Sequence, residues 1–389
     1  MEGPGGLSER QLGFRNKRST LDAIEIVVQI AREAIRWEGG SKEYCAVVTL
    51  DVKNAFNTAS WPKIIMALES FRVPKYLQRT ICDYFRDRWL IYKTDVGEKR
   101  YRVTCGVPQG SVLGPTLWNA MYNGVLGLSL PQGTTIVGYA DDLALVVVAK
   151  TIEILSQNCS TAVGTVTDWL EENGLSLAIQ KTESVLITSR KKLETFSFEF
   201  KGQIIQSKPN LHYLGILIDA RLTFKDHLTH VNDKAARINM AVSRLLSNMS
   251  AVREPKRRLL ARVTSSVILY AAPVWASSLQ KSSYAAGIVS TYRLSALRVA
   301  CAFRTISADA ICVIASMPPI ELLADEMRRL RAHASCSTRH TERQNTILVW
   351  QNKWDTSQKG RWTHKLITKI AKWVERKHGV LDFQPYSGY

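Results

Sequence analysis

The sequence predicts an α+β protein in which a mixed first half is followed by a basic, mainly helical second half. Apolar β-branched runs alternate with helical stripes up to about residue 220, and the pattern is nearly all helical from about residue 225. Residues 1–220 carry 25 basic and 23 acidic side chains, whereas residues 221–389 carry 27 and 11. We therefore expect two domains, 1–220 and 221–389, and nucleic acid as the commonest polyanion to bind the second.

The elements of the first half follow from periodicity, caps and turn residues. Ser19 and Asp22 resemble a capping box, and the helix that they open stops at Gly39-Gly40. The run CAVVTLD ends in Asp51 and predicts a buried strand. The remaining expected elements are helices at 61–71, 74–88, 115–128 and 151–173, a hairpin of 89–96 with 100–105, a loop at 106–115, and strands at 183–188, 195–200, 203–206 and 211–218.

Two neighbouring aspartates interrupt an otherwise apolar segment. In GYADDLALVVVA, Asp141 and Asp142 stand between two apolar runs. Aspartate is a common turn residue, so a hairpin tip explains one of them easily and both with some charge repulsion. A bound cation is the other explanation. Asp51 favours the cation, because this third carboxylate also ends an apolar strand and Mg²⁺ takes oxygen ligands of this type.

Six segments occur in an order that resembles a reverse transcriptase. RQLGFRNKRSTLDAI (10–24) resembles the fingers segment before motif A. Motifs A to E would be LDVKNAFN (50–57), GVPQGSVLGP (106–115), YADD (139–142), NGLSLAIQKTE (173–183) and HYLGILID (212–219). The set is most similar to the Pol proteins of insect non-LTR retrotransposons, in particular type-1 elements that insert into ribosomal RNA genes. The resemblance implies a right-hand polymerase with remnant fingers, a palm with an antiparallel sheet and a helical thumb, followed by a mainly helical basic region.

The resemblance assigns the chemistry to four side chains and one carbonyl. Asp51 and Asp141 would be the main Mg²⁺ ligands, with the backbone carbonyl of Val52 beside them, and Asp142 would be the third acidic residue. Two ions, Mg²⁺ or alternatively Mn²⁺, would stabilise charge as deoxynucleotides are added to a primer 3′-OH. Lys181 would give a proton to the pyrophosphate; without the resemblance it would be interpreted as a solvated surface charge.

Five further residues match positions that contact the incoming nucleotide. Arg15 and Arg18 match finger residues that bind the triphosphate, and Gln109 with Gly110 matches the motif B pair near the base. Phe56 lies where the family places an aromatic ring against the 2′-OH, which a flat apolar ring excludes by its size. The alternative for Phe56 is a core side chain, and without the resemblance the two arginines would be interpreted as solvated surface charges.

The primer and template contacts are expected in motif E and in the basic half. The motif E residues Tyr213, Leu214 and Gly215 match the primer grip. The run VREPKRRLLARV contains the cluster Lys256, Arg257 and Arg258, which we expect to bind nucleic acid.

Four tryptophans, Trp350, Trp354, Trp362 and Trp373, interleave with lysines and arginines near the C-terminus. Rings and cations together can hold single strands. The alternative is a basic helical domain with tryptophans in its core, and the near-helical spacing of Trp362 and Trp373 favours the core for them.

The implied partners are an RNA template, a DNA primer or target DNA, and deoxynucleoside triphosphates. No membrane partner is expected, since the most apolar stretch, 263–275, is short and contains two serines and a proline. Location in the nucleus follows only from the need to reach chromosomes. Nothing corresponds to the endonuclease domain that precedes the polymerase in these Pol proteins, and the fingers begin late, so we expect a fragment.

Three further possibilities stay open at this point. The chain could bind nucleic acid without catalysis, which the basic half and the short fingers favour. A Mg²⁺ nuclease could use the same aspartates, although motif B and Lys181 fit it poorly. A zinc site at His333, Cys336 and His340 lacks a second paired cluster.

Overall fold

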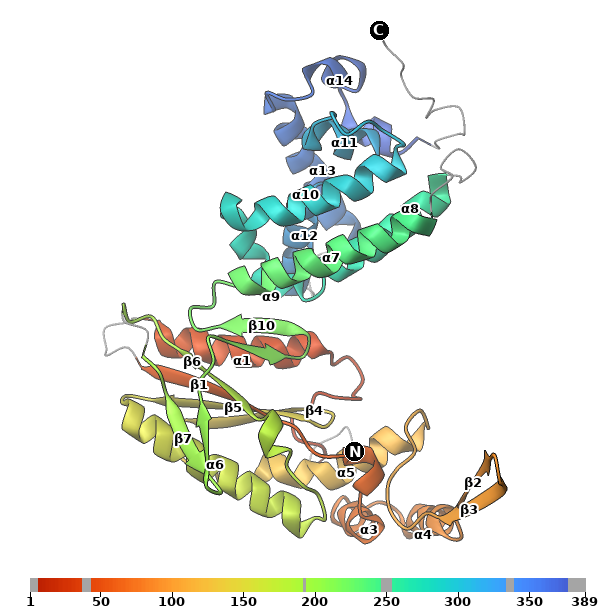
Figure 1. Cartoon of the computed structure of the whole chain (residues 1–389), viewed down its shortest axis with the longest axis vertical. Coiled ribbons are helices and arrows are strands. Elements are labelled where there is room, and N and C mark those ends of the chain that lie inside the picture. The colour runs from red at the N-terminus through yellow and green to blue at the C-terminus, as the bar shows by residue number, and fades with distance from the viewer. Residues whose placement is uncertain (1–5, 37–42, 192–193, 246–253, 334–338, 377–389) are drawn as a thin grey trace. The chain divides into compact units, whose positions relative to one another are not determined.

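The computed structural model describes residues 6–36, 43–191, 194–245, 254–333 and 339–376 (Figure 1). The chain divides into two compact units, Met1–Leu222 and Thr223–Tyr389. The first unit mixes strands and helices, and the described elements of the second are all helical. The predicted α+β class is therefore confirmed.

A four-stranded antiparallel sheet in the order β4-β5-β1-β6 is the centre of the first unit. Its strands are β1 (Tyr44–Leu50), β4 (Thr134–Tyr139), β5 (Asp142–Ala149) and β6 (Glu183–Ile187). The register between β1 and β5 runs from Tyr44 opposite Ala149 to Leu50 opposite Leu143. Because Leu50 faces Leu143, the next residues, Asp51 and Asp142, leave the two strands at the same end of the sheet.

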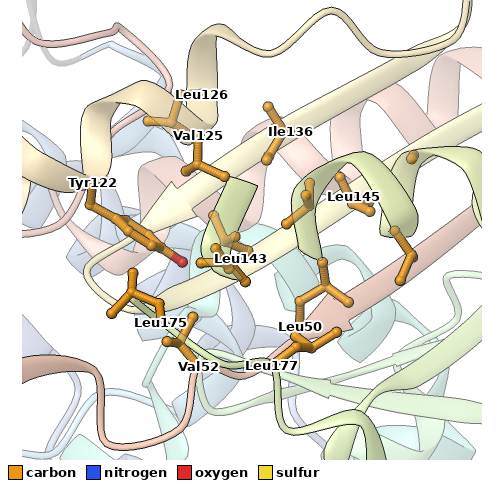
Figure 2. Packing of buried hydrophobic residues seen from close by; sticks show 14 of the residues in the cluster. Leu50, Val52, Tyr122, Val125, Leu126, Ile136, Leu143, Leu145, Leu175 and Leu177 are labelled. Atoms are coloured by element: carbon orange, nitrogen blue, oxygen red, sulfur yellow. The ribbon is translucent and has the colours of Figure 1, made fainter. Parts of the chain in front are cut away.

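Helices cover both faces of this sheet, α1 (Thr20–Ile35) on one and α6 (Ile152–Glu172) on the other (Figure 1). Side chains of β1 alternate between the faces. Tyr44, Ala46, Val48 and Leu50 belong to the hydrophobic cluster that includes the buried face of α6. Figure 2 shows part of this cluster, in which the ring of Tyr122 lies among leucines and valines.

The other elements of the first unit are helical segments and three two-stranded antiparallel hairpins. They are α2 (Ala55–Thr58), α3 (Trp61–Ser70), α4 (Lys75–Phe85), β2 (Trp89–Thr94), β3 (Gly97–Arg102), α5 (Leu113–Tyr122), η1 (Asn123–Gly127), η2 (Ile179–Lys181), β7 (Ser197–Phe200), β8 (Gln203–Gln206), β9 (Asn210–Tyr213) and β10 (Ile216–Asp219). The helix expected to reach residue 128 ends at Tyr122 and continues as the 3₁₀ segment η1.

The segment before α1 is bound to the end of β4. The backbone N–H of Leu12 donates to the carbonyl of Gly138 at 2.9 Å, and the N–H of Gly138 donates to the carbonyl of Arg10 at 2.9 Å. Gly13 then passes directly over Ala140, the residue that begins the turn between β4 and β5. The first unit therefore needs a residue without a side chain at this crossing.

The second unit is a set of helices tied together by a buried polar network. The helices are α7 (Lys225–Leu245), α8 (Glu254–Ile268), α9 (Ala272–Trp275), η4 (Ala276–Gln280), α10 (Ser282–Val299), α11 (Ala308–Ile314), α12 (Ile320–Ala332), α13 (Arg339–Thr356), α14 (Arg361–Leu366) and α15 (Ile370–Val374). The amide oxygen of Asn239 on α7 accepts hydrogen bonds from the hydroxyls of Thr264 on α8 and Ser295 on α10. This arrangement satisfies the buried polar groups of three helices at once.

The tryptophans of the second unit divide between core and surface. Trp350 and Trp354 are buried, whereas Trp362 is 64% exposed. The expectation that Trp362 fills the core is therefore wrong, because the short helix α14 turns this side chain outward. Cys336 of the considered zinc site lies outside the described residues.

Among the described residues, no single helix is long and apolar enough to cross a membrane. Residues 254–268 and 272–280 pass that test only as a pair bent by 55°, by length and composition alone.

Replacing Gly13 by alanine is expected to destabilise the first unit. A Cβ at this position would lie 2.1 Å from the backbone nitrogen of Ala140, so backbone would have to move. We expect the free energy of unfolding to fall by about 1–3 kcal/mol, the usual cost of overpacking, measured by thermal melts followed by circular dichroism. Gly127→Ala is the matched control, because nothing lies within 4 Å of its added Cβ. Equal melting of the two variants would contradict the packing argument.

Candidate active site

The turn between β4 and β5 places Asp141 and Asp142 beside the end of β1. Tyr139 and Asp142 face each other across the hairpin, so Ala140 and Asp141 form its tip. Ala140 has a φ of 58°, which a residue with a side chain rarely adopts. The turn therefore places one of its two central residues, Asp141, close to Asp51, which follows directly after β1.

Lys181 is brought to Asp51 by a short pairing that extends β1. The N–H of Lys53 donates to the carbonyl of Ser176, and the N–H of Ala178 donates to the carbonyl of Asp51, both at 2.8 Å. Segment 176–178 leads directly into η2, where the Lys181 ammonium lies 2.9 Å from the Asp51 carboxylate. Two residues 130 positions apart in the chain thus form one ion pair.

A cavity of about 620 Å³ opens over these residues. Six of the residues predicted from the sequence line it: Asp51, Val52, Phe56, Gln109, Asp141 and Lys181. The lining contains four charged side chains, an aromatic ring and several amides. Its size and composition suit a polar ligand with a flat apolar part.

Phe56 and Gln109 reach the cavity because the loop of residues 106–110 is bonded to α2. The N–H of Val107 donates to the carbonyl of Phe56 at 2.7 Å, and the N–H of Gly106 donates to the carbonyl of Ala59 at 2.8 Å. Gly106 has a φ of 88°, and a Cβ there would lie 2.6 Å from the Asn57 carbonyl oxygen. A glycine is therefore required for this close approach.

The other predicted nucleotide contacts do not line the cavity. The Arg15 guanidinium donates to the carbonyls of Ser8 and Gln11, and Arg18 forms an ion pair with Glu9. Both arginines thus hold the segment before α1 in this structure. Gly110 is exposed, with a φ of 84° and nothing within 4 Å of an added Cβ, so close backbone approach is open there.

The predicted primer-grip residues form the tight turn of the β9–β10 hairpin. Tyr213 faces Ile216, and Leu214 and Gly215 between them have φ values of 44° and 84°. Tyr213 is 3% exposed, and its hydroxyl is buried without a hydrogen-bond partner among the described residues. Burial and then the charge of Asp142 raise the pKa of Tyr213. Leu214 and Gly215 are the parts of this turn that a strand could touch.

The three basic residues of the second unit differ in their surroundings. Lys256 is exposed. Arg258 pairs with Glu254 and donates to the carbonyl of Ser316. Arg257 is 7% exposed and donates to the carbonyl of Val299. The expectation that Arg257 binds nucleic acid is therefore corrected, since its guanidinium is committed to the interior of the unit.

The carboxylates of the site repel one another. The pKa of Asp142 is raised to about 6 by partial removal from water and then by the charges of Asp141 and Asp51. Burial and Asp51 also raise the pKa of Asp141, against a backbone hydrogen bond that lowers it. Asp51 raises the pKa of Lys181 by a hydrogen bond and by its charge. The site therefore favours any group that brings positive charge.

The donor set fits a hard cation that keeps few protein ligands. Asp51 and Asp141 offer carboxylate oxygens in the cavity, and Val52 lies beside them. Within the described ranges, no group of three or more His, Cys, Asp or Glu side chains is arranged to hold an ion by itself. Mg²⁺ commonly binds through one or two carboxylates and completes its shell with water and phosphate, so this set is adequate for it.

Sequence reasoning missed several residues of the cavity wall. They are Lys53, Asn54, Ala55, Asn57, Ala178, Ile179, Gln180 and Gln203. Those next to Asp51, Phe56 and Lys181 could have been found by adjacency alone. Gln203 could not, because it comes from the start of β8 and no pattern in its neighbourhood connects it to the aspartates.

The titration of Asp142 provides a test of the site's electrostatics. In Asp141→Asn, we expect the pKa of Asp142 to fall from about 6 towards the ordinary 3.8, because a neighbouring like charge is removed. Carboxyl carbon NMR of the metal-free protein would measure it, with Glu199→Gln on β7 as the distant control. Since the folded-state pKa is raised, the stability contributed by Asp142 is present below about pH 4 and is lost as the pH rises through 6. An unchanged Asp142 titration in Asp141→Asn would show that the two charges do not interact.

Comparison with known proteins agrees with this geometry. Residues 5–218 match the family model described as reverse transcriptase (RNA-dependent DNA polymerase). The chain is 24% identical over 383 residues to a 115 kDa protein of the type-1 retrotransposable element R1DM of Drosophila melanogaster, covering 93% of this chain and 36% of that protein.

Two further relatives come from mobile elements. The Pol polyprotein of the type-1 retrotransposable element R1 of Bradysia coprophila is 23% identical, over 94% of this chain and 38% of the relative. The RNA-directed DNA polymerase from the mobile element jockey of Drosophila melanogaster is 26% identical, over 60% of this chain and 26% of the relative. The chain thus spans well under half the length of these relatives. Since the matched residues 5–218 are more than half of it, the chain belongs to the reverse transcriptase family.

Proposed function

We propose that this chain is an RNA-directed DNA polymerase of a non-LTR retrotransposon, which adds deoxynucleotides to a primer 3′-OH for target-primed retrotransposition. The observation that carries the proposal is one cavity lined by Asp51, Asp141, Lys181, Phe56 and Gln109. These residues come from four separate motifs of the family, so their meeting at one place is not expected of a remnant that has lost its active site.

The carboxylates have the first role in the proposed reaction. Reverse transcriptases generally use divalent metal ions. Asp51 and Asp141 would hold two Mg²⁺ ions here, with Mn²⁺ as the alternative, and the Val52 carbonyl would assist. The bound ions supply stabilisation of the charge that develops on the attacking and leaving oxygens. Asp142, outside the cavity lining, would contribute its negative charge to the same field.

Lys181 is suited to protonate the leaving pyrophosphate. A lysine ammonium carries a proton at neutral pH, and Asp51 raises the pKa of Lys181 further. The side chain is largely exposed, which leaves it free to turn from Asp51 towards a phosphate oxygen. Proton donation at this point assists departure of the leaving group.

Phe56 and Gln109 would select the nucleotide. The Phe56 ring lines the cavity and is held there by its neighbours, so it can exclude a 2′-OH by size. Gln109 has an amide that both donates and accepts, which suits contact with an incoming base. Arg15 and Arg18 would reach the triphosphate only after leaving their present partners.

The proposed partners are an RNA template, a DNA primer within target DNA, and deoxynucleoside triphosphates. Enzymes homologous to this chain bind RNA template and DNA. The second unit would hold the nucleic acid, since residues 221–389 carry 27 basic and 11 acidic side chains. Because the proposed primer is in chromosomal DNA, the protein would act in the nucleus.

Primer extension tests the activity directly. On a poly(rA) template with an oligo(dT) primer, Mg²⁺ and dTTP, the chain should extend the primer. We expect Asp141→Ala to lower the rate at least about 100-fold, because charge stabilisation in the transition state is lost. Asp168→Ala, an exposed carboxylate on α6, is the matched control. Extension by Asp141→Ala at the rate of the control would refute the proposal, as would extension that persists after Mg²⁺ is removed with EDTA.

Binding of single-stranded RNA tests the second unit separately. Lys256 is exposed and has no ion-pair partner among the described residues. In Lys256→Gln, we expect weaker binding and a salt dependence, log Kd against log salt, whose slope falls by about 1. Lys201→Gln is the control, because Lys201 already pairs with Glu171 in the first unit. Identical salt-dependence slopes for the two variants would show that Lys256 does not contact the RNA.

A further inference from the structure

Five aromatic rings form a continuous series from the cavity into the core of the first unit. Phe56 contacts Phe14 edge to face, with ring centroids 5.8 Å apart, and stacks on Trp118 at 5.2 Å with an interplanar angle of 23°. Trp118 stacks in turn on Tyr122 at 4.6 Å, and Tyr122 meets the edge of Trp169 at 6.0 Å. Each ring is thus fixed by the next.

Trp118 is the ring that joins this series to the catalytic turn. It is fully buried, and its indole Nε1–H donates to the carbonyl of Ala140 at 3.1 Å. One helical turn later, the Tyr122 hydroxyl donates to the carbonyl of Asp141 at 3.5 Å. Residues four apart share a face of α5, so one helix face holds both central residues of the turn.

The same tryptophan is the support behind Phe56. Phe56 lines the cavity, and the Trp118 indole stacks on its ring. Its remaining aromatic neighbour, Phe14, is 57% exposed and gives a weaker wall. A close-packed interior keeps a ring in place only while its neighbour fills the volume behind it. Removing the indole would leave a void into which Phe56 could turn away from the cavity.

We propose that Trp118 is a positioning residue for sugar selection: it holds Phe56 in place and couples that ring to the Ala140-Asp141 turn. The inference rests on the proposed function, because it needs a nucleotide in the cavity. It adds a residue that the cavity lining does not contain. Loss of the indole lets Phe56 retreat, so a ribonucleotide with its 2′-OH is accepted more readily relative to a deoxynucleotide.

The test compares incorporation of dATP and ATP, which share a base, opposite uracil in an RNA template. The measured quantity is the ratio of kcat/KM for the two nucleotides. We expect Trp118→Leu to lower this ratio by about two- to tenfold, the range that one aromatic stacking contact supports. Trp118→Phe, which keeps a ring but loses the N–H, should keep most of the wild-type ratio. Trp350→Leu, at a buried tryptophan of the second unit, is the control for general destabilisation. A smaller folded fraction lowers kcat/KM for both nucleotides by the same factor and leaves their ratio unchanged.

A double mutant shows whether Trp118 acts through Phe56. In the Phe56→Ala background, Trp118→Leu should change the ratio no further. The inference is overturned if Trp118→Leu keeps the wild-type ratio, or if it lowers the ratio by the same factor with and without Phe56.

If the wild-type chain extends no primer, the proposed function fails by itself. Equilibrium binding of dATP and ATP then decides the inference. A preference for dATP that falls in Trp118→Leu supports it, and equal preference in both proteins overturns it.

Discussion

The register between β1 and β5 is the constraint on which the site depends. Leu50 lies opposite Leu143, and both are fully or almost fully buried. Both faces of β1 and β5 are buried, so a shift of one residue would exchange the side chains that pack on α1 with those that pack on α6, and close packing of the two faces opposes that exchange. Once the register is fixed, Asp51 and the aspartates of the β4–β5 turn leave the sheet together. The convergence of charge is therefore a consequence of apolar packing several residues away.

The charge that this register assembles would be unfavourable without help. Burial and the charges of Asp141 and Asp51 raise the pKa of Asp142 to about 6, and burial and Asp51 raise the pKa of Asp141. Lys181 forms an ion pair with Asp51 and so brings a positive charge to this cluster. Backbone bonds of segment 176–178 bring that lysine there, so the compensating charge is delivered by the same local pairing that extends β1. The carboxylates thus favour a bound cation, and the Lys181 ammonium offsets part of the repulsion between them.

The sequence predicted most of this arrangement where local patterns determine it. Continuous apolar runs located β1 and the strands on either side of the aspartates, and the motif order located Asp51, Asp141, Phe56, Gln109 and Lys181, all of which line the cavity. Patterns were weaker where burial depends on tertiary packing. Nothing local to Arg257 shows that its guanidinium donates to the carbonyl of Val299, and nothing local to Trp362 shows that a six-residue helix exposes it. Gln203 reaches the cavity from a separate hairpin, which only the fold can bring there.

The segment before α1 shows how far the support of the site extends. Its backbone is bonded to β4 at Gly138, Gly13 crosses Ala140 closely, and the Asn119 amide donates to the Gly13 carbonyl at 2.8 Å. Asn119 follows Trp118 on α5, so the turn of Ala140 and Asp141 lies between a fixed helix and a fixed loop. Ala140 is held in a left-handed conformation by contacts on both sides, and backbone in that region persists only where its surroundings over-determine it. The strain at the turn thus indicates that the position of Asp141 is set by α5 and the segment before α1 as well as by the hairpin itself.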